Sequence, residues 1–123
     1  MTATTRNETP VAIETDGAEL RMKEIGGGLS VAFARFSKGT DTGPALKGLP
    51  DDLCPCPRWG YLLKGRLRMR TGEGPEAYEV YEEGQAFYWG PGHAPEALED
   101  CEYVDFSPTE EFGRVVGHLT SPG

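Results

Sequence analysis

Two cysteines and an arginine stand close together near the middle of the 123-residue chain, in the string LCPCPRWGY. Cys54, Cys56 and Arg58 alternate with other residues, so in an extended segment their side chains point to the same face. A thiolate is a soft metal ligand and a nucleophile, whereas a guanidinium binds carboxylates through paired hydrogen bonds. The spacing therefore predicts a group of chemically active side chains on one side of a strand.

Arg58 carries the most specific functional hypothesis of the three. A guanidinium that faces the protein interior is costly unless an anion pairs with it. The internal candidates are Asp52, Glu96 and Asp105, any of which would make Arg58 one half of a structural salt bridge. The alternative is that Arg58 binds an acidic or enolisable substrate and stabilises negative charge on its oxygen. The sequence leaves both interpretations open.

One of the two histidines follows a Pro/Gly-rich turn. His93 could act as a general base with Glu96 as its partner, or it could be a solvent-facing turn residue. Tyr61 is a second candidate for moving a proton. Tyr103 and Asp105, together with the cysteines and the arginine, are candidates for substrate binding.

Alternating apolar residues place these side chains on short strands. Residues 53–70 predict a β-hairpin with its turn at residues 64–65, and residues 86–89 and 101–106 predict further strands. The segment 37–53 is long and has few apolar residues, so it could cover the mouth of the sheet structure as a lid.

The C-terminal residues predict one short helix. Ser107 is a favourable N-cap, Pro108 suits the first helical position, and Glu110 completes a capping box. Four apolar residues then follow at helical spacing and predict a face that packs on the sheets: Phe112, Val115, Val116 and Leu119.

Two glycine-containing segments resemble the two sequence motifs of the cupin superfamily. Gly65 matches the closing glycine of the first motif, and Gly84 and Gly92 match glycines of the second. The resemblance implies an all-β fold, a cupin-type jelly-roll β-barrel with a short C-terminal helix. It also implies that a small molecule binds inside the barrel, and it allows a homodimer.

The positions that bind metal in cupins carry other residues in this chain. Counting from the motif glycines puts Asp52 and Cys54 at two of the histidine positions, Arg58 at the glutamate position and Pro95 at the third histidine position. The resemblance therefore predicts that no metal and no other cofactor is bound. An atypical site formed by cysteine and histidine is the alternative.

The composition limits the class of protein. A hydrophobic content of 37% is enough for the core of one domain, with residues 1–9 expected to be flexible, 10–106 to form the barrel and 107–123 to form the helix and tail. Twenty acidic and 12 basic side chains give a net charge of -8, which disfavours nucleic acid as a partner. The absence of a long apolar segment or leader, and the odd number of cysteines, predict a cytoplasmic protein without membrane association.

Three functional hypotheses remain. The first is an enzyme that performs metal-independent acid–base chemistry on a small acidic or carbonyl compound, by isomerisation, cyclisation, elimination or dehydration. The second is a ligand-binding or structural cupin without catalysis, and the third is a metalloenzyme with an atypical Cys/His site. We rank the first ahead because polar residues persist at barrel-facing positions while the metal ligands do not.

Overall fold

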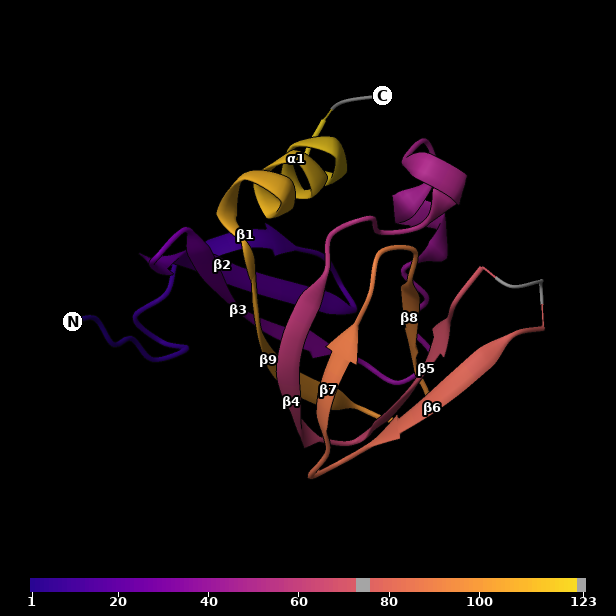
Figure 1. Cartoon of the computed structure of the whole chain (residues 1–123). Coiled ribbons are helices and arrows are strands. Elements are labelled where there is room, and N and C mark those ends of the chain that lie inside the picture. Colours follow the sequence, from indigo (N-terminus) through magenta and orange to yellow (C-terminus); the bar gives the residue numbers. More distant parts are fainter. Residues whose placement is uncertain (73–75, 122–123) are drawn as a thin grey trace.

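The computed structural model describes residues 1–72 and 76–121, which form nine strands, two short 3-10 helices and one α-helix. In chain order the elements are β1 (Val11–Glu14), β2 (Ala18–Gly26), β3 (Leu29–Phe36), η1 (Gly43–Leu46), η2 (Pro50–Asp52), β4 (Arg58–Lys64), β5 (Arg66–Arg70), β6 (Tyr78–Glu82), β7 (Ala86–Trp89), β8 (Ala94–Ala97), β9 (Cys101–Pro108) and α1 (Thr109–Leu119). All strand pairs are antiparallel (Figure 1).

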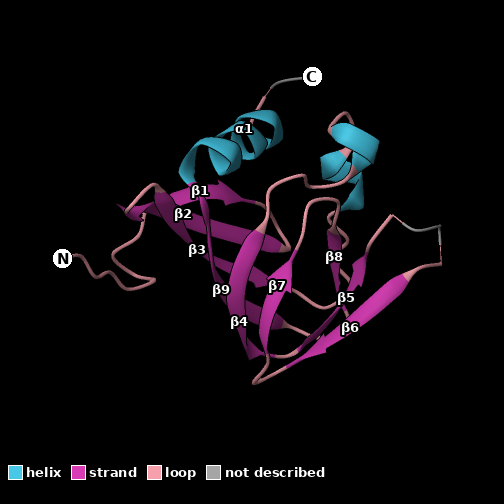
Figure 2. Ribbon diagram, in the orientation of Figure 1, coloured by secondary structure: helices cyan, strands magenta, loops and turns pink. Residues whose placement is uncertain are grey.

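The strands form two sheets that face each other in the manner of a jelly roll (Figure 2). The larger sheet has the order β1-β2-β3-β9-β4-β7, and the smaller has the order β6-β5-β8. Within the described residues the two hydrogen-bonded sheets stay separate, so the barrel is not closed by a continuous ladder. The predicted all-β jelly roll with a C-terminal helix is confirmed.

The segment predicted as a β-hairpin is instead a corner between the sheets. Strand β4 pairs with β7 and β9, whereas β5 pairs with β6 and β8. Gly65, between β4 and β5, has a φ of 84°, and a Cβ at this position would collide with the carbonyl oxygen of Asp100. Glycine permits this bend because it has no side chain. The prediction of the turn is confirmed, and the prediction that its two strands pair is wrong.

The helix begins one residue later than the capping pattern predicts. Ser107 and Pro108 still belong to β9, and the side chain of Ser107 points inward and donates a hydrogen bond to Asp105 at 3.5 Å. Pro108 takes the N-cap position without a side-chain cap bond, so the predicted capping box is wrong. No helix in the described part of the chain has the length and apolar character needed to cross a membrane.

Strand β8 is not expected from the sequence, because Pro95 and Glu96 have low strand propensity. It lies at the edge of the smaller sheet, where a proline that lacks an amide donor is tolerated. This strand carries Pro95 to the interior side of the protein, close to the segment that precedes η1. The amide of Thr42 donates to the carbonyl of Pro95 at 3.1 Å.

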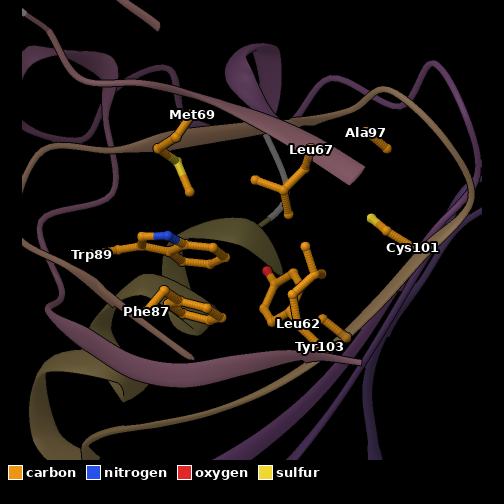
Figure 3. Packing of buried hydrophobic residues seen from close by; sticks show 9 residues of the cluster. Leu62, Leu67, Met69, Phe87, Trp89, Ala97, Cys101 and Tyr103 are labelled. Carbon is orange, nitrogen blue, oxygen red and sulfur yellow. The ribbon is translucent and has the colours of Figure 1, made fainter. Parts of the chain in front are cut away.

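The core consists of two buried clusters. An aromatic cluster lies between the sheets, where the rings of Phe87 and Trp89 stack with centroids 3.6 Å apart and Tyr103 meets Trp89 edge-on at 5.1 Å (Figure 3). The second cluster lies under α1 and includes the fully buried Phe112 and the buried Val115. The predicted apolar face of the helix is therefore confirmed.

The N-terminal segment that was expected to be flexible makes specific contacts with β2. Arg6 forms an ion pair with Glu19, and Arg21 donates to the carbonyl of Thr9 at 3.2 Å. Thr9 is buried. The flexibility of residues 1–9 as a whole stays a prediction.

Candidate ligand-binding site

A cavity of about 270 Å³ lies between the first two strands, the η1 segment and α1. Four of the buried residues that line it are polar or contain sulfur, and all four are candidates from the sequence: Cys54, Arg58, His93 and Tyr103. Two other surface depressions are lined largely by charged residues near Asp100 and contain none of the predicted site residues.

The segment 37–53 forms part of the cavity wall, as expected of a lid. Thr40, Asp41 and Thr42 line the cavity just before η1, and Ala45 and Leu46 line it from η1 itself. The amide of Gly43 donates to the carboxylate of Asp41 at 2.8 Å, which fixes the start of η1. A closing motion of this segment stays a prediction.

Arg58 forms a buried ion pair with Asp105. Its Nη1 lies 3.2 Å from Oδ2 of Asp105, whose side chain is completely buried, and Arg58 itself is 8% exposed. The pairing follows from the strand register, because Gly60 on β4 lies opposite Asp105 on β9 and Arg58 is two residues away on the same face. Of the three candidate partners, the structure selects Asp105.

The electrostatics of the pair are set by burial and by mutual attraction. Burial alone would lower the pKa of Arg58, but the charge of Asp105 reverses this and holds the pKa above its ordinary value. Burial raises the pKa of Asp105, and the guanidinium of Arg58 opposes that rise. Arg58 is therefore positively charged, beneath the ring of Phe112, whose centroid lies 4.2 Å from Cζ.

Asp105 does not use the whole guanidinium. Nη1 of Arg58 donates to the carboxylate, and Nη2 lies 3.7 Å from Sγ of Cys54. Among the described residues, Nε of Arg58 has no hydrogen-bond acceptor. Because a guanidinium has five N–H donors, Arg58 retains donors for a ligand in the cavity.

His93 is buried beside Arg58 and is neutral. Its Nδ1 lies 2.8 Å from the carbonyl oxygen of Gly90, and since a carbonyl can only accept, Nδ1 carries the proton and Nε2 is the unprotonated nitrogen. Burial and the charge of Arg58 lower the pKa of His93 to about 4. Nε2 has no partner among the described residues, so it is an acceptor that remains for a ligand.

Glu96 is not the partner of His93. It accepts hydrogen bonds from Arg68 at 2.9 and 3.2 Å, on the smaller sheet. The predicted His93–Glu96 dyad is therefore wrong, and a backbone carbonyl orients the imidazole instead. The fixed position also contradicts the alternative of a solvent-facing turn residue, because His93 is 4% exposed.

Tyr103 contributes a neutral hydroxyl to the cavity. Burial raises the pKa of Tyr103, partly opposed by Arg58, so the phenol keeps its proton. Its hydroxyl has no hydrogen-bond partner within the described residues, and its ring packs in the aromatic cluster (Figure 3). The cavity thus combines a cation, a neutral acceptor and a neutral donor.

Three other predicted site residues lie away from the cavity. Tyr61 is 43% exposed on the outer face of the larger sheet, so its expected role at the pocket is not supported. Arg58 and Tyr61 are three residues apart on one strand, so their side chains point to opposite faces of the sheet. This odd spacing can be read from the sequence, and it argues against a shared site. Cys56 is buried but does not line the cavity. Asp105 does not line the cavity either, and it contacts the lining residue Arg58 through their ion pair.

The side chains of this site do not fit a metal ion. Arg58 brings a buried positive charge to the cavity, which repels a cation. Asp52 is exposed and accepts a hydrogen bond from the amide of Gly48 at 2.9 Å, so it faces away from the cavity. Among the described residues, no three His, Cys, Asp or Glu side chains converge in a metal-binding arrangement.

Apolar residues that sequence reasoning did not assign to a site form most of the cavity wall. They come from β1, β2, β3, η1 and α1, and the largest are Ile13, Leu20, Phe36, Leu46, Val115 and Leu119. The helical spacing identifies Val115 and Leu119 as a packing face, but only the fold shows that this face also borders a cavity.

No protein-family model and no curated protein sequence matches the chain. Solved structures do match it. An RmlC-like cupin from Shewanella frigidimarina has a TM-score of 0.61 at 16% identity, over 89% of this chain and 93% of that one. KdgF from Halomonas sp. has a TM-score of 0.59 at 22% identity, over 85% and 90%.

Oxalate decarboxylase from Bacillus subtilis is a larger relative in structure. Its TM-score is 0.65 at 17% identity, and the match covers 88% of this chain but 29% of the decarboxylase. At these identities the likeness concerns the fold. The chain therefore shares the fold of these cupins, as the spacing of its motif glycines predicts.

Proposed function

We propose that the protein binds a small organic acid or carbonyl compound in the cavity and catalyses acid–base chemistry on it without a metal ion. The observation that carries the proposal is the convergence of Arg58, His93 and Tyr103 on one cavity. Isomerisation, cyclisation, elimination and dehydration all require that a proton leave a carbon or oxygen while negative charge develops on a neighbouring oxygen. The three side chains provide groups for both events.

Each side chain has a distinct role in this proposal. Arg58 binds the anionic oxygen of the substrate through the donors that Asp105 leaves unused, and a well-placed donor to a developing oxyanion contributes about 3–4 kcal/mol. His93 accepts a proton at Nε2. Its low pKa makes it a weak base, so the charge of Arg58 must acidify the substrate proton that it removes. Tyr103 donates a hydrogen bond to a second oxygen.

One structural neighbour with this fold, oxalate decarboxylase, acts on a small acid, oxalate. A non-catalytic ligand-binding protein is the second candidate here. The buried Arg58–Asp105 pair and the weak basicity of His93 favour it, because both reduce the reactivity of the site. The two candidates share the cavity and differ only in whether a proton is transferred.

The test combines binding and proton exchange. Small carboxylates and 2-oxo acids are screened by thermal shift and by ligand-observed NMR, and the binders are incubated with the protein in D2O. Loss of a ligand C–H signal that depends on the protein identifies proton transfer, whereas binding without exchange supports the second candidate. If no acid or carbonyl compound binds, the proposal is wrong.

A conservative variant tests the role of Arg58. Arg58→Lys keeps a positive charge beside Asp105 but loses the planar pair of donors, so ligand affinity should fall while the protein remains folded. Arg66→Lys is the matched control, because Arg66 is half exposed and pairs with Glu99 outside the cavity. Equal affinities in the two variants would remove Arg58 from the proposal.

The metalloenzyme is the third candidate, and it has the weakest support because Arg58 stands at a ligand position. Elemental analysis of the purified protein checks it. One Zn, Fe, Ni or Cu per chain, lost in a Cys54→Ser or His93→Gln variant, would favour this candidate over the first.

We also propose a homodimer that forms through the outer face of the larger sheet. Outward side chains on β7, β4, β9 and β3 form two adjacent apolar rows in the strand register. The exposed or half-buried members of the rows are Tyr88, Trp59 and Phe106, and next to them Ala86, Tyr61, Val104 and Phe33. A contiguous apolar surface of this kind is typical of an interface, and a second copy presents the same surface.

Sedimentation velocity of the purified protein tests the dimer. Trp59→Lys places a charge at the centre of the rows, next to Tyr88, whose ring centroid is 5.3 Å from that of Trp59. The variant should be monomeric. Val80→Lys, at an exposed apolar position on the smaller sheet, is the control and should leave the dimer intact. A monomeric wild-type protein would contradict this proposal.

A further inference from the structure

We infer that the ligand of the Arg58 cavity, if this is the binding site proposed above, is a monocarboxylic acid with a compact hydrocarbon body, branched, alicyclic or aromatic. The polar side chains that line the cavity form two groups, one buried and one exposed or half-buried. Arg58, His93 and Tyr103 are buried at its inner end, whereas the other polar lining residues are exposed or half-buried. The surface between these groups is formed by hydrocarbon side chains.

The apolar wall comes from both sides of the cavity. Ile13 and Leu20 line the cavity from the first two strands, and Leu46, Val115 and Leu119 line it from η1 and α1. Leu46 and Val115 are buried, and the other three are half-buried. A ligand whose charged end reaches Arg58 must therefore place the rest of its body against hydrocarbon, where burial of apolar surface is favourable.

The same wall rejects polyhydroxylated acids and dicarboxylic acids. A hydroxyl group placed against Leu20 or Val115 would lose water without gaining a hydrogen bond, and each such loss weakens binding about tenfold or more. A second carboxylate would lack a cation, because Arg58 is the only charged basic side chain among the described residues that line the cavity. Selectivity for an apolar body follows from these two costs.

The volume limits the size of the ligand. A cavity of about 270 Å³ corresponds to about nine water-sized volumes of ~30 Å³ each. The ligand therefore has about ten non-hydrogen atoms, which is enough for one six-membered ring with a carboxylate.

Three probes of similar size separate the contributions of charge and hydrocarbon. Cyclohexanecarboxylate has both the charge and the apolar body, cyclohexanecarboxamide lacks the charge, and threonate has the charge on a polyhydroxylated body. We expect cyclohexanecarboxylate to bind at least tenfold more tightly than either of the others, measured by calorimetry or by ligand-observed NMR.

One substitution in the wall tests the contact directly. Ile13→Thr keeps a β-branched side chain on β1 and replaces a hydrocarbon branch with a hydroxyl. The affinity for cyclohexanecarboxylate should therefore fall about tenfold. Val11→Thr makes nearly the same chemical change on the same strand at an exposed position outside the cavity, and it should leave the affinity unchanged. Circular dichroism checks that both variants fold.

The outcomes separate this inference from the proposed function. One outcome would be that threonate binds as tightly as cyclohexanecarboxylate, that Arg58→Lys lowers the affinity for both acids, and that Ile13→Thr lowers the affinity for neither. The cavity would then bind acids, and the inference that the ligand has a hydrocarbon body would be refuted. If neither acid binds the folded protein but another acid or carbonyl compound of the screen does, this inference is refuted and the proposed function stands. If no acid or carbonyl compound binds, both fail.

Discussion

Removal of Arg58 should destabilise the protein strongly at neutral pH. The charged atoms of Arg58 and Asp105 are 3.2 Å apart, and at an effective dielectric constant of about 20 their attraction is about 5 kcal/mol. This attraction offsets the cost of taking two charges out of water. In Arg58→Met the carboxylate of Asp105 stays completely buried, and among the described residues only the hydroxyl of Ser107 remains as a side-chain donor to it. We therefore expect a loss of about 3–5 kcal/mol in the free energy of unfolding.

The loss should depend on pH. Burial raises the pKa of Asp105 in the folded protein, and in Arg58→Met no cation opposes this rise. A carboxyl group with a raised folded-state pKa binds its proton more tightly in the native state than in the unfolded state, so the native state gains stability as the pH falls through that pKa. The deficit of Arg58→Met relative to the wild type should therefore be largest near pH 8 and smaller near pH 5.

Urea unfolding of both proteins at these two pH values measures the deficit. The double variant Arg58→Met/Asp105→Leu replaces both charges with hydrocarbon and should recover most of the lost stability. Arg35→Met is the control, because it removes a partly exposed partner of Glu102 and should cost less than about 1 kcal/mol. The reasoning is refuted if Arg58→Met costs no more than Arg35→Met at either pH.

Three further changes have defined outcomes. The pKa of His93 is lowered to about 4 from an ordinary value near 6.5, so its contribution to stability is present above about pH 6.5 and is lost as the pH falls toward 4. An NMR titration of the imidazole should therefore give a midpoint near 4. The His93→Gln variant should lose less melting temperature in acid than the wild type does. Gly65→Ala should cost about 2 kcal/mol or more in urea unfolding, because φ is positive and a Cβ would contact the carbonyl of Asp100, whereas Gly113→Ala on the open side of α1 should gain about 0.5–1 kcal/mol. Burial raises the pKa of the Cys56 thiol to about 11, so labelling by a thiol reagent near pH 8 should be much slower than for free cysteine, and labelling at the rate of free cysteine would contradict its burial.

The sequence predicts which side chains face inward better than it predicts which strands pair. Cys54, Cys56 and Arg58 are all buried, as their alternation indicates, although only Arg58 lies within a regular strand. Alternation reports a local property, the face of the chain on which each residue lies. Pairing depends on residues far apart in sequence, so the turn at Gly65 could be located while the sheets that its two strands join could not.

The partners of the charged residues were open for the same reason. Asp52, Glu96 and Asp105 were equally acceptable partners of Arg58 by residue type, and the register of β4 against β9 decides for Asp105. Glu96 is held by Arg68 because the register of β5 against β8 places these two residues opposite each other. Residue types thus indicate that an ion pair is required, and strand register determines its members.

The buried ion pair has a consequence for the ligand that the cavity accepts. A carboxylic acid that binds the remaining donors of Arg58 brings a second negative charge close to Asp105. Because burial already raises the pKa of Asp105, the added charge raises it further, and Asp105 should take up a proton as the ligand binds. Affinity should then fall as the pH rises, and the calorimetric enthalpy of binding should depend on the ionisation enthalpy of the buffer. A binding enthalpy that is the same in every buffer would mean that the ligand and Asp105 share Arg58 without protonation.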